Sequence, residues 1–242
     1  MSDLLQIERI GKRFRGLKAL DDVSFSVKEG GVFGIIGANG AGKTTLFNII
    51  SGAIKPDVGI VRFAGVDVTG RAPSRLCIAG IGRTFQIARP FPDLTVLETI
   101  RVAVLCRVYA MRAATERAVA IAHRFGLAQK LDRRGRHLNV LERKRLELAR
   151  AYATGPRLLL LDEVAAGLRP SEVDVFVDIV RAVASENITV LMIEHVLAAV
   201  FTLARRVVVL DQGKTIADGT PQAVAADPKV VEAYLGAGYA AP

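Results

Sequence analysis

The sequence has little of what marks a disulfide-stapled or metal-binding protein. Among its 242 residues only Cys77 and Cys106 are cysteines, and neither lies at a metal-ligand spacing or near a histidine in the sequence. A disulfide framework and a zinc site are therefore not expected, and reduced thiols in a cytosolic protein fit better. The sequence also has no internal repeat and no low-complexity linker.

Long apolar stretches are lacking as well. No run approaches the ~18–20 consecutive apolar residues that a helix needs to cross a bilayer. The longest strongly apolar runs, such as Leu158–Leu161 and Val207–Leu210, have the length of strands. The N-terminus has neither the basic start nor the apolar block of a signal peptide. We therefore expect a cytoplasmic protein.

The composition that remains is that of a globular protein. Hydrophobic residues make up 51% of the chain and charged residues 24%, which supplies ample material for a core. The length suits one large domain or a domain with a sizeable insertion. The net charge of +9 is compatible with nucleic acid, an anionic membrane surface or a phosphate ligand. A solvated basic surface accounts for most of it, so charge alone decides nothing.

Short apolar runs alternate with helical patterns, which indicates an α/β fold with a mostly parallel sheet and crossover helices. An antiparallel β element is expected at the N-terminus. The predicted strands are Leu4–Ile10, Val23–Val27, Val32–Ile36, Ile60–Phe63, Leu158–Leu161, Thr189–Ile193 and Val207–Leu210. A helix is predicted after Pro170, with one apolar face. That face consists of Val173, Phe176, Val177, Val180 and Val183.

The middle of the chain has a different character. Between about residues 87 and 154 strand signals fade, and Ala, Arg and Leu dominate in a helical pattern. We interpret residues 87–154 as a helical subdomain inserted into a core made of residues 1–86 and 155–242.

One segment carries a phosphate-binding pattern. Residues Gly37 to Thr44 fit G-x-x-x-x-G-K-[ST], between an apolar strand and a predicted helix that runs from Thr45 to Ser51. Glycines let consecutive backbone N–H groups point into one concavity, and the helix N-terminus adds positive potential. The Lys43 ammonium can reach the outer phosphates, and the Thr44 hydroxyl can ligate Mg²⁺. The predicted nucleotide-binding residues here are Gly37, Asn39, Gly40, Ala41, Gly42, Lys43, Thr44 and Thr45.

A second segment carries acids where such a fold would need them. Four leucines, a typical buried strand, are followed directly by Asp162 and Glu163. Acids at the end of a strand face the crevice in which open α/β folds bind ligands. Asp162 can hold Mg²⁺ or its water, and Glu163 can polarise the water that attacks the phosphate.

Together with these two segments, the positions of Phe14, Gln86, Leu138–Ala151 and His195 give the whole chain a likeness to a known family. It resembles the ATPase subunits of ABC (ATP-binding cassette) transporters. This resemblance implies that Phe14 stacks on adenine and that Gln86 contacts both Mg²⁺ and the attacking water. It also implies that His195 contacts the γ-phosphate. The predicted catalytic residues are then Glu163, His195, Gln86 and Lys43, and the predicted metal ligands are Thr44, Gln86 and Asp162.

Further stretches resemble the branched-chain amino-acid importer branch of that family. They are Gly82–Gln86, Phe91–Glu98, Ala165–Leu168, Ile193–His195 and Glu232–Gly236. The resemblance implies an ATP- and Mg²⁺-dependent motor for the import of branched-chain amino acids or related small polar or organic-acid substrates. It also implies membrane permease subunits as partners, and indirectly an extracytoplasmic substrate-binding protein. The expected location is cytoplasmic, peripheral on the inner face of the cell membrane.

One stretch departs from the family pattern. The family's signature, usually Leu-Ser-Gly-Gly-Gln, reads Leu138-Asn139-Val140-Leu141-Glu142 here. In the family this loop donates N–H groups and a hydroxyl to the ATP of a partner subunit. Valine and leucine add bulk, and Glu142 adds a negative charge that Arg143 or Arg145 would have to offset. We therefore expect a second, different ATPase subunit and a heterodimer with two unequal sites.

Three other functions stay open at this point. The lipopolysaccharide-export ATPase resembles this branch in length and in its Tyr-Leu-Gly ending, but keeps a regular signature. A non-transport ABC protein of translation or DNA repair would carry two cassettes or long coiled insertions, which this chain lacks. A regulatory module that holds ATP without turnover is the third. No nucleic-acid partner is expected, because no aromatic platform is interleaved with the basic cluster. That cluster consists of Arg133, Arg134, Arg136, Arg143, Lys144 and Arg145.

Overall fold

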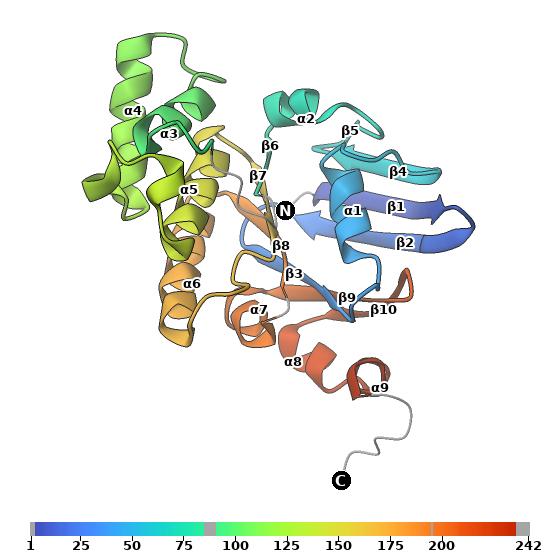
Figure 1. Cartoon of the computed structure of the whole chain (residues 1–242). Helices are drawn as coiled ribbons and strands as arrows, with labels where there is room; N and C mark the ends of the chain where they lie inside the picture. The colour runs from blue at the N-terminus through green and yellow to red at the C-terminus, as the bar shows by residue number, and fades with distance from the viewer. Residues whose placement is uncertain (1–2, 85–90, 195, 236–242) are drawn as a thin grey trace.

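The computed structural model describes residues 3–84, 91–194 and 196–235. They form two sheets with helices packed around them (Figure 1). The expected α/β class, with a mostly parallel sheet and an N-terminal antiparallel element, is confirmed.

The larger sheet has six strands in the order β10-β9-β3-β8-β7-β6, and all neighbours are parallel except the β9–β10 pair. Its strands are β3 (Val32–Gly37), β6 (Ile81–Arg83), β7 (Leu158–Asp162), β8 (Thr189–Ile193), β9 (Arg206–Asp211) and β10 (Lys214–Gly219). The smaller sheet is antiparallel, in the order β2-β1-β4-β5. Its strands are β1 (Asp3–Phe14), β2 (Leu17–Lys28), β4 (Val58–Phe63) and β5 (Val66–Asp67).

The leucine run of β7 is buried along its whole length because both faces of the strand are covered. Leu158 and Leu160 pack into a core shared with the antiparallel sheet and with α1 (Lys43–Ile50). Leu159 and Leu161 point the other way, into a core shared with the helices of the middle segment. β7 therefore lies between two hydrophobic cores and contributes leucines to both.

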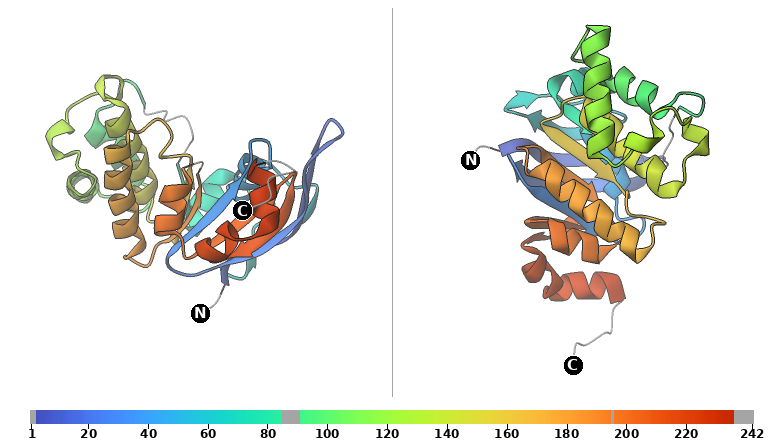
Figure 2. Two further views of the ribbon diagram at one scale, coloured as in Figure 1. Left: turned by 90° about the horizontal axis from the view of Figure 1, so that it is seen from below. Right: turned by 90° about the vertical axis from the view of Figure 1, so that its left-hand side faces the viewer.

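The middle of the chain is helical, as its composition predicts. It contains α3 (Val96–Val104), α4 (Met111–Arg124) and α5 (Val140–Ala153), with two short 3₁₀ turns at Ala128–Lys130 and Gly135–His137. These helices gather on one side of the molecule, away from β1 and β2 (Figures 1 and 2). The subdomain limits at residues 87 and 154 stay a prediction.

The remaining helices flank the sheets. They are α2 (Pro73–Ala79), α6 (Pro170–Ala184), α7 (Leu197–Leu203), α8 (Pro221–Ala225) and α9 (Pro228–Leu235). Pro170 opens α6, and Phe176, Val177, Val180 and Val183 are buried, which confirms the predicted apolar face; Val173 is only half-buried. No helix in the described ranges is long and apolar enough to cross a membrane.

Several predicted boundaries differ from the structure, and β4 begins at Val58 rather than Ile60. β1 and β2 extend beyond the predicted strands, because the end of their hairpin is half-exposed and polar, and an apolar run marks only the buried part. Helix α1 begins at Lys43 rather than Thr45. Its first two residues have helical backbones although their side chains belong to the phosphate loop.

The two-core arrangement predicts a large effect of truncating β7. Leu160→Ala should lower the free energy of unfolding by about 2–5 kcal/mol, because it removes fully buried methyl groups and leaves a cavity. Val175→Ala, at a position on α6 that is 40% exposed, should change it by less than about 0.5 kcal/mol. Urea unfolding followed by circular dichroism measures both. Equal effects would show that β7 is not a buried central strand.

Candidate functional site

The phosphate-loop sequence connects β3 to α1, as its pattern predicts. Gly42 caps α1 with a φ of 103°, and a Cβ there would lie 2.5 Å from the carbonyl oxygen of Ala19. A Cβ at Gly37 would lie 2.1 Å from the carbonyl oxygen of Leu210. Only glycine fits at both positions. The loop can therefore fold tightly enough for its N–H groups to surround an anion at the helix N-terminus.

The Lys43 side chain lies inside this loop. It is 5% exposed, and its ammonium donates hydrogen bonds to the carbonyls of Gly37 at 2.8 Å and Ala38 at 2.9 Å. Burial lowers the pKa of Lys43, and the negative charge of Glu163 opposes that shift. A cation is thus fixed where phosphate oxygens would lie, with a carboxylate close by.

A cavity of about 630 Å³ lies over the loop. Residues 39–45, Phe14 and Glu163 line it, together with Leu17–Ala19 and Gln212. The structure thus brings together the predicted adenine-stacking residue, the predicted phosphate loop and the predicted water-polarising acid. Gly37 does not line the cavity. Phe14 is 42% exposed, so its ring is available to a ligand.

Asp162 ends β7 and is 1% exposed. Its Oδ2 accepts a hydrogen bond of 2.8 Å from Nη2 of Arg83, whose Nη1 also reaches Asn48 and Ser51 of the α1 end. Its Oδ1 is buried and has no hydrogen-bond partner within the described ranges. Burial raises the pKa of Asp162, and the Arg83 charge opposes this shift. A buried carboxylate oxygen without a donor suits a cation ligand or an ordered water.

Glu163 follows in a left-handed conformation, with a φ of 50° and 8% exposure. Its N–H donates to the carbonyl of Ile193 at 2.9 Å, which continues the β7–β8 ladder by one residue. This turn sends the carboxyl group out of the sheet and into the nucleotide-sized cavity. Non-glycine residues rarely adopt such a backbone, and where they do it is often at a functional site.

The altered signature forms the start of α5. Asn139 is the N-cap: its Oδ1 accepts the N–H of Glu142 at 2.9 Å, and the Glu142 carboxylate accepts the N–H of Asn139 at 3.0 Å. This is a reciprocal capping box. The charge of Glu142 is offset by Lys130 at 3.1 Å. Of the two arginines expected to offset it, Arg143 and Arg145, Arg143 donates to the Leu138 carbonyl.

Two predicted catalytic residues, Gln86 and His195, lie outside the described residues. Three contributors were missed by the sequence reasoning: Arg83, Lys144 and Glu194. Lys144 donates to the Glu163 carbonyl at 3.4 Å, and Glu194 accepts the N–H of Ala165 at 2.8 Å. Their only signal in the sequence was proximity to a motif, because ion pairs across strands leave no periodic pattern.

Comparison with family models gives two matches. Residues 20–166 match the model of the ABC transporter family, and residues 214–240 match that of the branched-chain amino acid ATP-binding cassette transporter. The chain is also 36% identical to the high-affinity branched-chain amino acid transport ATP-binding protein BraF of Pseudomonas aeruginosa, over 96% of this chain and 98% of that protein. It is 35% identical to a probable branched-chain amino acid transport ATP-binding protein of Methanocaldococcus jannaschii, over 97% and 98%.

Solved structures of ATP-binding cassettes have the same fold as this chain. A crystal structure of a nucleotide-free ATP-binding cassette from an ABC transporter superposes with a TM-score of 0.89 at 35% identity, covering 97% of this chain and all of that one. The ADP conformation of such a cassette gives a TM-score of 0.88, also at 35% identity, over 98% of this chain.

The buried position of Lys43 predicts that Lys43→Ala strongly weakens nucleotide binding. We expect the Mg-ATP dissociation constant to rise by about 100-fold or more, since a buried charge-assisted contact to phosphate is lost. Glu163 lies in the same cavity, but its negative charge repels the phosphates. Glu163→Gln should therefore keep or strengthen Mg-ATP binding. Isothermal titration with Mg-ATP measures both. Retained affinity in Lys43→Ala would place the nucleotide elsewhere.

The capping box predicts that Asn139→Ala destabilises α5. Loss of the side-chain acceptor should cost about 1 kcal/mol of unfolding free energy. Asn139→Ser keeps an acceptor at the N-cap and should recover most of that loss. Urea unfolding of the three proteins is the measurement. An unchanged midpoint in Asn139→Ala would mean that the cap contributes nothing.

Proposed function

Since the chain belongs to the ABC transporter family of ATP-binding proteins, we propose that it is the ATP-hydrolysing subunit of an importer for branched-chain amino acids. Related small polar or organic-acid substrates are included, because other subunits of the importer would select the cargo. The observation that carries the proposal is one cavity lined by Phe14, the phosphate loop and Glu163. The similarity to branched-chain amino acid transport ATP-binding proteins supports the substrate class.

ATP binds with its adenine on Phe14 and its phosphates in the loop around Lys43. Glu163 orients a water in line with the γ-phosphate and accepts its proton as the bond to the leaving oxygen breaks. Lys43 and the loop N–H groups stabilise the charge that spreads over the phosphate oxygens. Gln86 and His195 would complete the set, as the family resemblance implies.

Mg²⁺ fits the acids and hydroxyls at this site. Asp162 has a buried oxygen without a donor, and the Thr44 hydroxyl lines the cavity. Thr44, Asp162 and Gln86 would hold the cation directly or through water. When bound, Mg²⁺ neutralises phosphate charge and favours the leaving group.

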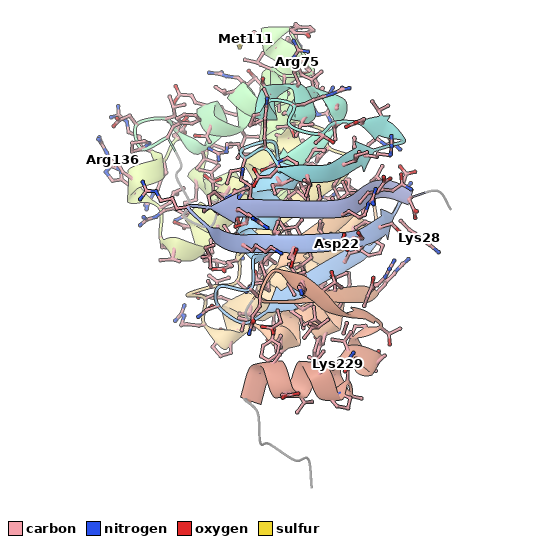
Figure 3. The ribbon with its side chains drawn as sticks, turned by 90° about the vertical axis from the view of Figure 1, so that its right-hand side faces the viewer. Asp22, Lys28, Arg75, Met111, Arg136 and Lys229 are labelled. Atoms are coloured by element: carbon pink, nitrogen blue, oxygen red, sulfur yellow. The ribbon has the colours of Figure 1, made fainter. Side chains whose placement is uncertain are left out.

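Members of this family act with membrane permease subunits, and this chain has a surface that suits such a partner. A groove of about 420 Å³ lies between α2, β6, α3 and α5. Phe91 and Val102, 47% and 49% exposed, line it, together with Pro73 and Cys106. Figure 3 shows Arg75 of α2 and Met111 of α4 at one end of the molecule. The permease would dock on this groove and hold the chain on the inner face of the membrane, linking it indirectly to an extracytoplasmic substrate-binding protein.

The start of α5 supports pairing with a different ATPase subunit. In a family dimer the signature N–H groups serve the ATP of the partner, but here the N–H groups of Asn139 and Glu142 are already bonded within the chain. Val140 is 53% exposed where the backbone would have to approach the phosphate. A regular signature from another subunit would complete the site at Lys43 and Glu163. The reciprocal site would hold ATP and turn it over slowly. This asymmetry also disfavours a lipopolysaccharide-export homodimer.

Steady-state ATPase activity tests this proposal. The chain alone should bind Mg-ATP but turn over slowly, and adding its ATPase partner and permease should raise turnover by about tenfold or more. In that assembly Glu163→Gln should stop turnover, while the equivalent change in the partner should leave most of it. Equal losses from the two changes would overturn the heterodimer. Rapid turnover by the chain alone would show that residues 138–142 work as a signature.

A further inference from the structure

A buried carboxyl group lies behind the catalytic turn and has no role in the mechanism above. Glu194 directly follows β8 and is 1% exposed. Its Oε1 accepts the N–H of Ala165 at 2.8 Å, and its Oε2 has no hydrogen-bond partner in the part of the chain that the structure describes. Ala165 is two residues beyond Glu163, so Glu194 holds the turn through which the catalytic carboxylate leaves the sheet.

The turn at Glu163 requires restraints from its neighbours. The left-handed backbone of Glu163 costs about 1–2 kcal/mol relative to an ordinary conformation and persists only where neighbours enforce it. On its N-terminal side, the Glu163 N–H is fixed to the Ile193 carbonyl of β8. On its C-terminal side, Glu194 fixes Ala165. Both restraints come from consecutive residues of one strand end, so β8 sets the position of the catalytic turn.

A third restraint comes from the helix that begins at the altered signature. Lys144 of α5 is half-buried and donates to the Glu163 carbonyl at 3.4 Å. The charges of Glu194 and Glu163 both favour the charged form of Lys144 against the effect of its burial. The start of α5, the catalytic turn and the end of β8 therefore meet in one cluster of three charged side chains.

Glu194 contributes less to stability at neutral pH than at acid pH. Burial raises the pKa of Glu194 to about 7, against an ordinary value of 4.5, although Ala165 N–H and Lys144 oppose the shift. Between these two values the unfolded chain has lost the proton and the folded chain keeps it. Stability from this group therefore falls as pH rises from 4.5 to 7 and stays reduced above 7. Stability at neutral pH therefore does not explain a carboxyl group at this position, whereas its hydrogen bond to Ala165 bears directly on the Glu163 turn.

We propose that Glu194 is a positioning residue for ATP hydrolysis, which holds the Glu163 turn by accepting the Ala165 N–H and ties it, through Lys144, to the start of α5. The proposal rests on the proposed ATPase function. Glu194 does not touch nucleotide or the attacking water. It fixes the backbone from which the catalytic carboxylate projects, and links that backbone to the helix whose N-terminus faces the second subunit.

Three variants of the full chain separate positioning from packing. Glu194→Ala removes the acceptor, and Glu194→Gln keeps an oxygen at the same distance without the charge. Thr189→Val is the matched control, because Thr189 lies at the opposite end of β8, is fully buried, and its Oγ1 accepts the N–H of Gly30 at 2.8 Å. Amide hydrogen exchange of residues 163–168 is measured on the chain alone. ATP turnover is measured on the assembled transporter, and Mg-ATP affinity on both.

We expect Glu194→Ala to speed exchange at residues 163–168 and to lower kcat by about tenfold or more with little change in ATP affinity, because only the turn has moved. Glu194→Gln should restore both to within about threefold. At pH 8 the melting temperature of Glu194→Gln should be higher than that of the wild type, because glutamine cannot form a buried charge. Near pH 4.5 the two melting temperatures should be equal. Thr189→Val should lower the melting temperature without changing kcat.

Two results would overturn the inference: unchanged exchange and kcat in Glu194→Ala, or an equal loss of kcat in Thr189→Val. An assembly in which the wild type itself fails to hydrolyse ATP would instead refute the proposed function. The exchange measurement on the chain alone would still decide whether Glu194 holds the turn.

Discussion

The chain must leave the buried end of β7 and turn at once, and the site depends on how it does so. Asp162 still belongs to the sheet and is paired with Arg83, whereas Glu163 already has a left-handed backbone and faces the cavity. Two adjacent carboxyl groups thereby acquire separate surroundings, one beside a guanidinium and one beside the Lys43 ammonium. Their different environments allow neighbouring residues to hold a cation and to activate water.

Much of the site could be predicted from the sequence, because short local patterns determine the strand β7 and the phosphate loop. The leucine run before Asp162 predicted a strand buried on both faces, and β7 is such a strand. The loop from Gly37 to Thr44 required a strand before it and a helix after it, and β3 and α1 are in those places. Only the family resemblance predicts an adenine contact for Phe14, which lines the same cavity as the loop.

The rest could not be predicted because it depends on contacts between distant segments. Arg83 and Asp162 are far apart in the chain, and nothing in either neighbourhood indicates their ion pair. The sequence predicts an unfavourable charge at Glu142 near phosphate unless Arg143 or Arg145 offsets it, and it does not indicate that Glu142 caps its own helix and pairs with Lys130. That outcome follows from helix-end chemistry, which becomes visible only once the first residue of α5 is known.

The capped start of α5 bears on how such a complex is put together. Asn139 accepts the N–H of Glu142 and Glu142 accepts the N–H of Asn139, so two of the N–H groups at this helix end are bonded within the chain. Formation of this cap therefore requires neither a nucleotide nor a second subunit. In an assembly, this helix end would then be ordered before a second subunit arrives.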